Sequence, residues 1–534
     1  MTADLILHNA KIYTVDERRP WAEAAAIANG RFVAVGDNNT IGQLAGPQTK
    51  WIDANGRLAL PGLTDAHVHF LQVAIRRRQA SLFGVADFAA VQRLVAAAAA
   101  QTTPGHWLLG WGWDENLWDV APTAAQLDAI APDIPIALAR MDMHTWWVNS
   151  AALRLAGIDA TTPDPPESKI ERDENGRPTG ILREWNAIEL VQVHIPEPDM
   201  AAMETWLREA IGEAHRLGLT GIHDQRVERE GWQSFRLWQT LRRQNKLKLR
   251  VHMNIAADYI GEAAVLGLQP GFGDDTLWIG HAKSFADGTM GSRTASMLAP
   301  FEREPDNQGV IVTGADELWQ IATQAAAAGF AMSVHAIGDR AVREVIDVLG
   351  ERQSADAAAG PLLPHRIEHV QLIHPDDLPR LARHNLVASM QPVHLLTDWS
   401  TADRVWGGRA RYAYAFRALL DEGTPLAFGS DAPVAPLNPM LGIYAALTRQ
   451  DEQGLPAAGW YPEEKLKLPE IIWAYTMGPA ALAGKTAVQG SITPGKWADL
   501  ILLADDLFTI PPAAVKDARV DMTIFSGEVV FQRK

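Results

Sequence analysis

Six side chains able to bind a metal ion stand within or at the ends of short apolar runs. His67 and His69 are two residues apart in LTDAHVHF, so on a β-strand both would face the same side. The others are Lys283, His335, His369 and Asp431. Histidine and carboxylate ligands in one cavity suit Zn²⁺, with Fe²⁺ or Mn²⁺ as alternatives. The sequence therefore predicts a site for one or two divalent metal ions.

The runs that carry these residues indicate the fold that brings them together. Ala- and Leu-rich helical segments alternate with the runs, which is typical of repeated βα units. Because catalytic groups of a closed barrel lie at the carboxyl ends of its strands, an α/β (β/α)8 TIM barrel would gather all six. The eight predicted strands are 63–70, 219–224, 249–255, 277–285, 330–336, 366–372, 386–392 and 425–431.

The rest of the chain predicts two additions to the barrel. Residues 1–60 and 484–534 both contain β-like runs separated by turn residues, so we expect them to form one discontinuous β-sandwich domain. The barrel would occupy residues 61–483. Residues 71–215 follow the first strand and are far too many for a loop of about 4–6 residues, so they should form an inserted subdomain.

Composition narrows the function classes. A chain of 534 residues with 47% hydrophobic composition can bury a large core. Its net charge of −16 argues against nucleic-acid or anionic-membrane partners, and its lack of cysteine excludes thiolate ligands and cysteine nucleophiles. The N-terminus lacks the pattern of a signal peptide, which predicts a cytoplasmic protein. A homodimer is expected as the common state of large soluble enzymes.

An ordered set of motifs over nearly the whole chain resembles the amidohydrolase superfamily, and within it amidohydrolase family 3, the YtcJ-like metal-dependent hydrolases. These motifs are PGLTDAHVH, HAKSFADGTMGSRTA, VHAIGDRA, RIEHVQ and GSDAPV, together with WVNSAAL, QPVH and GSITPGKWADLILL. The resemblance implies that His67 and His69 bind a first metal, which Asp431 also contacts. It implies that His335 and His369 bind a second, and that Lys283, often carboxylated in relatives, bridges the two.

The chemistry implied is hydrolysis of a C–N bond in an amide-type substrate, such as an N-substituted formamide. A metal-activated hydroxide would attack the carbonyl, and Asp431 would act as general base and then as general acid toward the leaving amine. An alternative for Lys283 is direct binding of a substrate carboxylate.

Four further residues are candidates for binding a small-molecule substrate. Trp113 belongs to a group of tryptophans in the insertion that predicts either a pocket for an apolar or aromatic substrate or ordinary core packing. His144 lies in MDMHTWWVNSAAL, where Met143 replaces the glycine usual in the family, so His144 either contacts substrate or packs within the insertion. His281 should face the same way as Lys283, where it would contact substrate or support a metal ligand. Arg293, on the loop after the same strand, would line the barrel mouth or be a solvated loop residue.

Other reactions remain open on this scaffold. Deamination of a heterocyclic amine uses related barrels, but the glutamate common after the fifth strand is missing from AIGDR after His335. A decarboxylase or epimerase is a further alternative, because a fold does not fix a reaction. A non-enzymatic binding or regulatory protein ranks last, since no expected ligand is missing.

Overall fold

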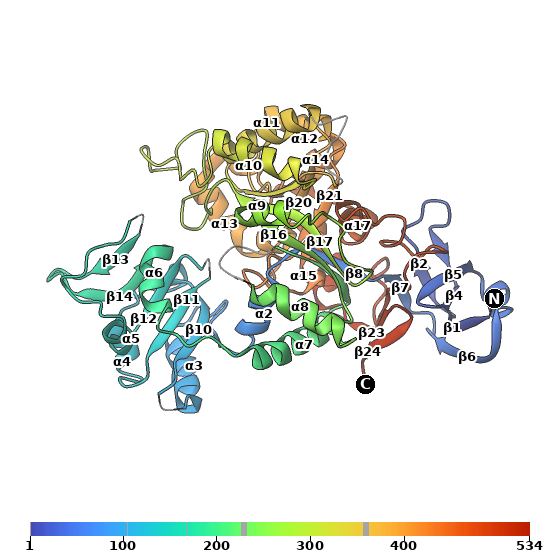
Figure 1. Cartoon of the computed structure of the whole chain (residues 1–534), viewed down its shortest axis with the longest axis horizontal. Coiled ribbons are helices and arrows are strands. Elements are labelled where there is room, and N and C mark those ends of the chain that lie inside the picture. The colour runs from blue at the N-terminus through green and yellow to red at the C-terminus, as the bar shows by residue number, and fades with distance from the viewer. Residues whose placement is uncertain (1, 104, 142, 167, 226–231, 356–362) are drawn as a thin grey trace. The chain divides into compact units, whose positions relative to one another are not determined.

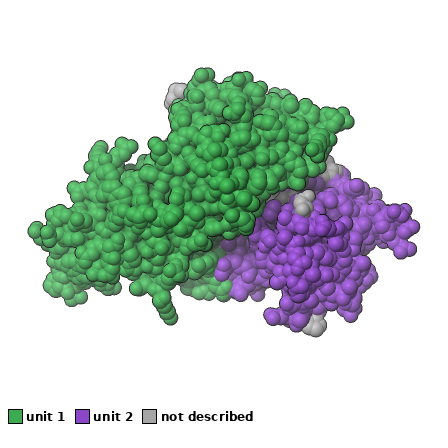
Figure 2. All heavy atoms as spheres, turned by 180° about the vertical axis from the view of Figure 1, so that it is seen from behind, with its two compact units in different colours: residues 1–70, 208–534 green, residues 71–207 purple. Residues whose placement is uncertain are grey.

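The computed structural model describes residues 2–103, 105–141, 143–166, 168–225, 232–355 and 363–534. The chain divides into two compact units (Figure 2). Unit 1 comprises Met1–Phe70 and Arg208–Lys534, and unit 2 comprises Leu71–Leu207. The domain boundaries expected at residues 60, 215 and 484 stay predictions.

Unit 1 contains a sheet of eight parallel strands in sequential order, which confirms the predicted (β/α)8 barrel (Figure 1). The last strand returns to the first, because the Asp431 amide donates to the His67 carbonyl at 2.7 Å and the His69 amide donates to the Ala432 carbonyl at 2.9 Å. The strands are β8 (Leu63–Val68), β15 (Leu219–Asp224), β16 (Arg250–Ala256), β17 (Leu277–Phe285), β18 (Met332–Ala336), β19 (Arg366–His369), β20 (Val387–Met390) and β21 (Leu426–Phe428).

Helices connect these strands as expected for a parallel barrel. They include α7 (Met200–Arg216), α8 (Gln233–Arg243), α9 (Ile260–Val265), α10 (Ala315–Ala327), α11 (Asp339–Ala355), α12 (Leu378–Arg383), α13 (Leu395–Trp406), α14 (Phe416–Asp421), α15 (Pro439–Thr448), α16 (Leu468–Ala474) and α17 (Met477–Leu482). Every residue of β8, β15 and β16 is buried, including polar side chains such as Asp65, His223 and His252, so the interior of the barrel is rich in paired polar groups.

Both chain ends contribute to a β-sandwich in unit 1. One sheet has the order β5-β4-β1-β6 and the other β24-β23-β22-β7-β2-β3, so the second joins N-terminal and C-terminal strands. A shared apolar core that includes Leu7, Ile27, Leu500 and Ile524 packs between them. The strands are β1 (Ala3–His8), β2 (Lys11–Tyr13), β3 (Trp21–Ala22), β4 (Ala24–Ala28), β5 (Arg31–Gly36), β6 (Ala45–Asp53), β7 (Leu58–Pro61), β22 (Leu500–Leu503), β23 (Val520–Phe525) and β24 (Glu528–Gln532).

A buried ion pair fixes the sandwich to the barrel. Arg250, the first residue of β16, pairs with Asp499 just before β22, with Nη2 2.9 Å from Oδ1. The guanidinium also lies 3.8 Å from the centroid of the Trp497 ring. Since an unpaired charge would be costly there, these contacts hold the two parts of unit 1 in one arrangement.

Unit 2 has its own mixed six-stranded sheet, in the order β13-β14-β12-β11-β10-β9. Helix α3 (Phe88–Gln101) begins at Asp87, whose carboxylate accepts hydrogen bonds from the amides of Ala89 and Ala90. The strands are β9 (Ala80–Ser81), β10 (Leu108–Trp113), β11 (Ile136–Arg140), β12 (Thr145–Val148), β13 (Lys169–Arg172) and β14 (Pro178–Arg183). Among the described residues of both units, no helix is long and apolar enough to cross a membrane.

Candidate metal centre

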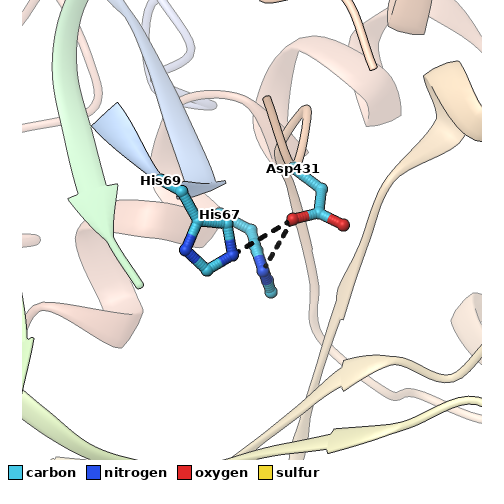
Figure 3. Close-up of side chains that lie close together, drawn as sticks. All are labelled: His67, His69 and Asp431. Carbon is cyan, nitrogen blue, oxygen red and sulfur yellow. Dashed lines mark ion pairs between the residues drawn. The ribbon is translucent and has the colours of Figure 1, made fainter. Parts of the chain in front are cut away.

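Three of the predicted ligands converge at the carboxyl end of the barrel. His67 lies on β8, and His69 follows that strand directly. Their Nε2 atoms lie 3.3 Å and 3.4 Å from the same oxygen, Oδ1 of Asp431 (Figure 3). Two imidazoles and a carboxylate thus face one point, as a metal-binding site requires.

The backbone around Asp431 explains how this carboxylate reaches the histidines. Asp431 lies beyond β21, which is shorter than the predicted strand 425–431, and its φ of 59° is in the left-handed region. Asp65 on β8 accepts hydrogen bonds from the amide (3.0 Å) and hydroxyl (2.5 Å) of Ser430. This contact attaches the loop of Asp431 to the strand that carries His67. A left-handed residue costs free energy, so its place here is consistent with a functional constraint.

A second carboxylate sets which nitrogen of His67 is available. The Nδ1 atom of His67 lies 2.6 Å from Oε2 of Glu368, a buried residue on β19. Since a carboxylate accepts, Nδ1 carries a proton, and Nε2 is the nitrogen through which His67 can bind a cation. Glu368 in turn accepts from Ser333 Oγ at 2.6 Å and pairs with the Arg366 guanidinium.

His335 and His369 lie beside this group. Their ring centroids are 4.5 Å apart, and the centroid of the His369 ring lies 4.9 Å from that of the His67 ring. The Nε2 atom of His335 donates to the Gly288 carbonyl at 2.9 Å, which leaves Nδ1 as its acceptor nitrogen. His369 ends β19 with a φ of 70°.

His394, which follows β20, adds a fifth histidine. Its Nε2 atom lies 3.8 Å from Oδ2 of Asp431, whereas His67 and His69 face the other oxygen, Oδ1. Ligand atoms of His369, His394 and Asp431 all lie within 4.8 Å of one another. We call His67, His69, His335, His369, His394 and Asp431 the carboxyl-end cluster.

Lys283 on β17 is 2% exposed, and its Nζ has no hydrogen-bond partner among the described residues. Nζ lies 4.1 Å from the centroid of the Phe285 ring. Burial lowers the pKa of Lys283 to about 8, although Glu368 and Asp431 act in the opposite direction. A buried amine without a partner is costly, so this position fits a modified or metal-linked lysine.

Charge at Asp431 favours a cation. Burial alone would raise the pKa of this carboxyl, but neighbouring His67, with hydrogen bonds from His67 and His69, holds the pKa well below its usual range. Tetrahedral zinc with bonds of about 2.0–2.1 Å separates its ligands by about 3.3 Å, close to the separations between the Asp431 oxygen and the two histidines. The donor set therefore fits a divalent metal ion.

Comparison with known proteins decides the family. The model of the amidohydrolase family matches residues 50–531. This chain belongs to the amidohydrolase family. The match confirms the predicted family, and with it an enzyme that is a metal-dependent hydrolase of C–N bonds.

Several relatives of this amidohydrolase cover most of the chain. Protein LONG AFTER FAR-RED 3 of Arabidopsis thaliana is 32% identical over 94% of this chain and 88% of its own length. The putative amidohydrolase YtcJ of Bacillus subtilis is 29% identical, with 99% of both chains covered. The N-substituted formamide deformylase of Arthrobacter pascens is 26% identical over 99% of this chain and 98% of its own length. An uncharacterized metal-dependent hydrolase from Pyrococcus horikoshii has a similar structure, with a TM-score of 0.78, 25% identity, and coverage of 95% and 99%.

His281, predicted to bind substrate, lies in a second group of buried histidines within the amidohydrolase barrel. Trp278 Nε1 donates to His252 Nδ1 at 2.8 Å, so His252 must donate from Nε2 to His281 Nδ1 at 3.0 Å. His281 Nε2 then donates to the Pro364 carbonyl at 3.0 Å. Burial lowers the pKa of both histidines well below its usual value. Both ring nitrogens of His281 are therefore engaged within the protein, and its contact with substrate stays a prediction.

His223 completes this group, which we call the inner histidine stack (His223, His252 and His281). Its ring stacks on that of His252 at 4.3 Å, and its Nδ1 accepts from Arg366 Nη1 at 2.9 Å. A Cβ added at Gly280 would lie 2.2 Å from His252 Nε2, so the stack needs a glycine there. Arg366 touches both the stack and Glu368, and so links the two groups of histidines.

The other predicted substrate contacts lie outside the carboxyl-end cluster. Trp113 is fully buried in unit 2, where its Nε1 donates to the Leu138 carbonyl at 2.8 Å. His144, also in unit 2, has Nδ1 2.8 Å from Glu184 Oε2. Arg293, in unit 1, forms an ion pair with Glu304, and its side chain is 45% exposed. Their roles toward a substrate stay predictions.

Sequence reasoning assigned no role to Glu368, His394 or Asp65. Glu368 directly precedes His369 in RIEH, and His394 ends the motif QPVH, so both lay in motifs already singled out. A carboxylate beside a ligand histidine was the available signal, because metal-binding histidines usually donate their other nitrogen to such a group.

Proposed function

We propose that this amidohydrolase cleaves the C–N bond of a small amide with an apolar or aromatic substituent. The observation that carries the proposal is the approach of His67 and His69 to one oxygen of Asp431, at 3.3 Å and 3.4 Å. The relative named as an N-substituted formamide deformylase, similar over 98% of its length, favours formamides among amides.

We assign the metal to the predicted ligands, with zinc as the first choice. His67, His69 and Asp431 would hold one ion, and His335 and His369 a second, with Lys283 between them as a carbamate. When bound, a divalent ion lowers the pKa of water and polarises a carbonyl. Glu368 holds a proton on Nδ1 of His67, and the Gly288 carbonyl holds one on Nε2 of His335, so Nε2 of His67 and Nδ1 of His335 are the nitrogens that would bind the metal.

Asp431 has a separate role in proton transfer. Its Oδ1 faces His67 and His69, whereas Oδ2 faces His394. We assign Oδ2 as the atom that takes a proton from the attacking water and returns it to the leaving nitrogen. Water supplies the oxygen of the new acid, the C–N bond breaks, and the amine leaves with the transferred proton.

Activity tests the reaction class. Purified protein is incubated with N-alkyl and N-aryl formamides and with the matching acetamides, and release of acid and amine is measured. We expect turnover that is abolished by a chelator and restored by Zn²⁺. Release of ammonia from aminated heterocycles, with no amide cleavage, would instead support the deaminase alternative.

Metal content tests the assigned ligands. Elemental analysis should give close to two zinc ions per chain, falling to one or none in Lys283→Ala. Lys496→Ala is a matched control, because this lysine is also buried but donates to the Gln489 carbonyl at 2.9 Å. One metal ion that Lys283→Ala leaves in place would remove the bridge, and no metal in any of the three proteins would contradict the proposal.

A further inference from the structure

His394 is a polar group at the carboxyl end of the barrel that the proposed metal set does not use. It ends the short 3₁₀ turn Pro392–His394 after β20, and its ring stacks on that of His369 at 6.3 Å and 25°. Its Nε2 is buried and has no hydrogen-bond partner among the described residues. Buried polar atoms nearly always have a hydrogen-bond partner, so we expect this nitrogen to contact a bound molecule.

The atom that His394 faces identifies the step in which it takes part. Nε2 lies 3.8 Å from Oδ2 of Asp431, which is too long for a direct hydrogen bond. One atom of a bound molecule could form a hydrogen bond with both. Oδ2 is the oxygen to which the proposed function assigns the proton that reaches the leaving amine. A group bound between these atoms is therefore beside the proton donor.

The two atoms that border this gap favour a nitrogen that carries hydrogen. His394 Nε2 and Asp431 Oδ2 can each accept a hydrogen bond, so an N–H group suits the gap better than an anion does. A metal ion is less well matched here, because 3.8 Å exceeds the ligand separation of about 3.3 Å at tetrahedral zinc.

We propose that His394 is a catalytic residue that contacts the leaving nitrogen of the scissile amide through Nε2 and holds it beside Oδ2 of Asp431. This inference rests on the proposed function. As the C–N bond breaks, the proton that Asp431 took from water passes from Oδ2 to the nitrogen, and the amine departs neutral. His394 gains and loses no proton over the reaction; it orients the nitrogen that receives one.

The test compares leaving groups of different basicity. Formanilide releases aniline, which needs proton transfer to leave, whereas 4-nitroformanilide releases a much weaker base that needs it less. We expect His394→Ala to lower kcat/KM by about 100-fold for formanilide and by less than about ten-fold for 4-nitroformanilide. His394→Gln, which keeps a hydrogen-bonding amide, should fall between wild type and His394→Ala for formanilide.

Two controls separate this role from others. Zinc content should be the same in wild type and both His394 variants. His374→Gln replaces a histidine on the loop after β19 whose side chain is 37% exposed and lies near Asp376, and it should leave both rates unchanged.

Each other result overturns the inference in a distinct way. Equal losses for the two anilides with full zinc content would make His394 a positioning residue, and a fall in zinc content would make it a metal ligand. Unchanged rates in His394→Ala would remove it from the reaction. If wild type cleaves neither anilide, the proposed formamide activity fails first, and the contact with the leaving nitrogen falls with it.

Discussion

The barrel carries two groups of largely buried histidines that differ in what their ring nitrogens face. In the inner histidine stack, His252 and His281 pass hydrogen bonds in one direction from Trp278 to the Pro364 carbonyl, and no ring nitrogen of either is spare. In the carboxyl-end cluster, the Nε2 atoms of His67 and His69 face a carboxylate across 3.3 Å and 3.4 Å. Burial alone therefore does not distinguish a structural histidine from a ligand; the partners of its two nitrogens do.

The largest effect is expected where the carboxyl-end cluster loses its carboxylate. Asp431→Asn keeps the shape of the side chain but removes its charge and its ability to accept the proton. We expect turnover to fall by about 10²–10⁴-fold, with little change in the denaturant midpoint. Steady-state kinetics and chemical denaturation check this. Turnover within about ten-fold of wild type would remove Asp431 as the general base.

The opposite pattern is expected in the inner histidine stack. His252→Ala removes the acceptor of Trp278 Nε1 and the donor to His281, and leaves a cavity among fully buried side chains. We expect the free energy of unfolding to fall by about 2–5 kcal/mol. Chemical denaturation measures the loss of stability. Zinc is measured separately on the folded protein, and its amount per folded chain should be the same as in wild type. A variant of normal stability that has lost zinc would show that the stack belongs to the metal site.

The two groups of histidines also show which features of the barrel can be predicted from the sequence. The eight strands were predictable, because short segments with apolar residues alternate with helical segments along the chain, and the predicted ligands stand within these segments or at their ends. The hydrogen-bond partners of the histidine ring nitrogens were not predictable. His281 and Lys283 were expected to face the same way, and both are buried, but His281 meets His252 across neighbouring strands. That contact depends on strand register, which no local pattern of residues specifies.

Glu368 and His394 were missed for related reasons. An acid next to a histidine in RIEH reads equally as a surface residue of a strand, and only the barrel interior reveals that it meets His67, some three hundred residues earlier. His394 follows Pro392, at the start of a helix rather than on a strand, so strand periodicity gave it no direction. Motif membership marked both residues without giving either a role.

Substitution of Glu368 should have an intermediate effect, because this residue contacts both groups of histidines. It contacts the carboxyl-end cluster directly at His67 and the inner histidine stack by way of Arg366. Glu368→Gln can still accept from His67 but no longer carries the charge that favours a protonated Nδ1. We expect zinc affinity to fall by about 10–100-fold. Titration of metal-free protein against a competing chelator checks this.

Folding must be separated from metal binding in this variant, because the substitution leaves the Arg366 guanidinium without its buried charge partner. Glu368→Asp is the second variant, since it keeps the charge on a shorter side chain. If zinc affinity is unchanged in Glu368→Gln while the fold is destabilised, Glu368 belongs with the inner histidine stack and serves structure alone.

The smallest effect is expected at a charged residue outside both groups. Arg293 pairs with Glu304 near the surface, its side chain is 45% exposed, and such pairs contribute about 0–1 kcal/mol to stability. We expect Arg293→Ala to change the free energy of unfolding by less than about 1 kcal/mol and to leave zinc content as in wild type. The informative measurement is KM for substrates with and without a carboxylate. A rise in KM confined to the carboxylate-bearing substrate would make Arg293 the substrate contact predicted from its motif, whereas equal KM values would leave its ion pair with Glu304 as its role.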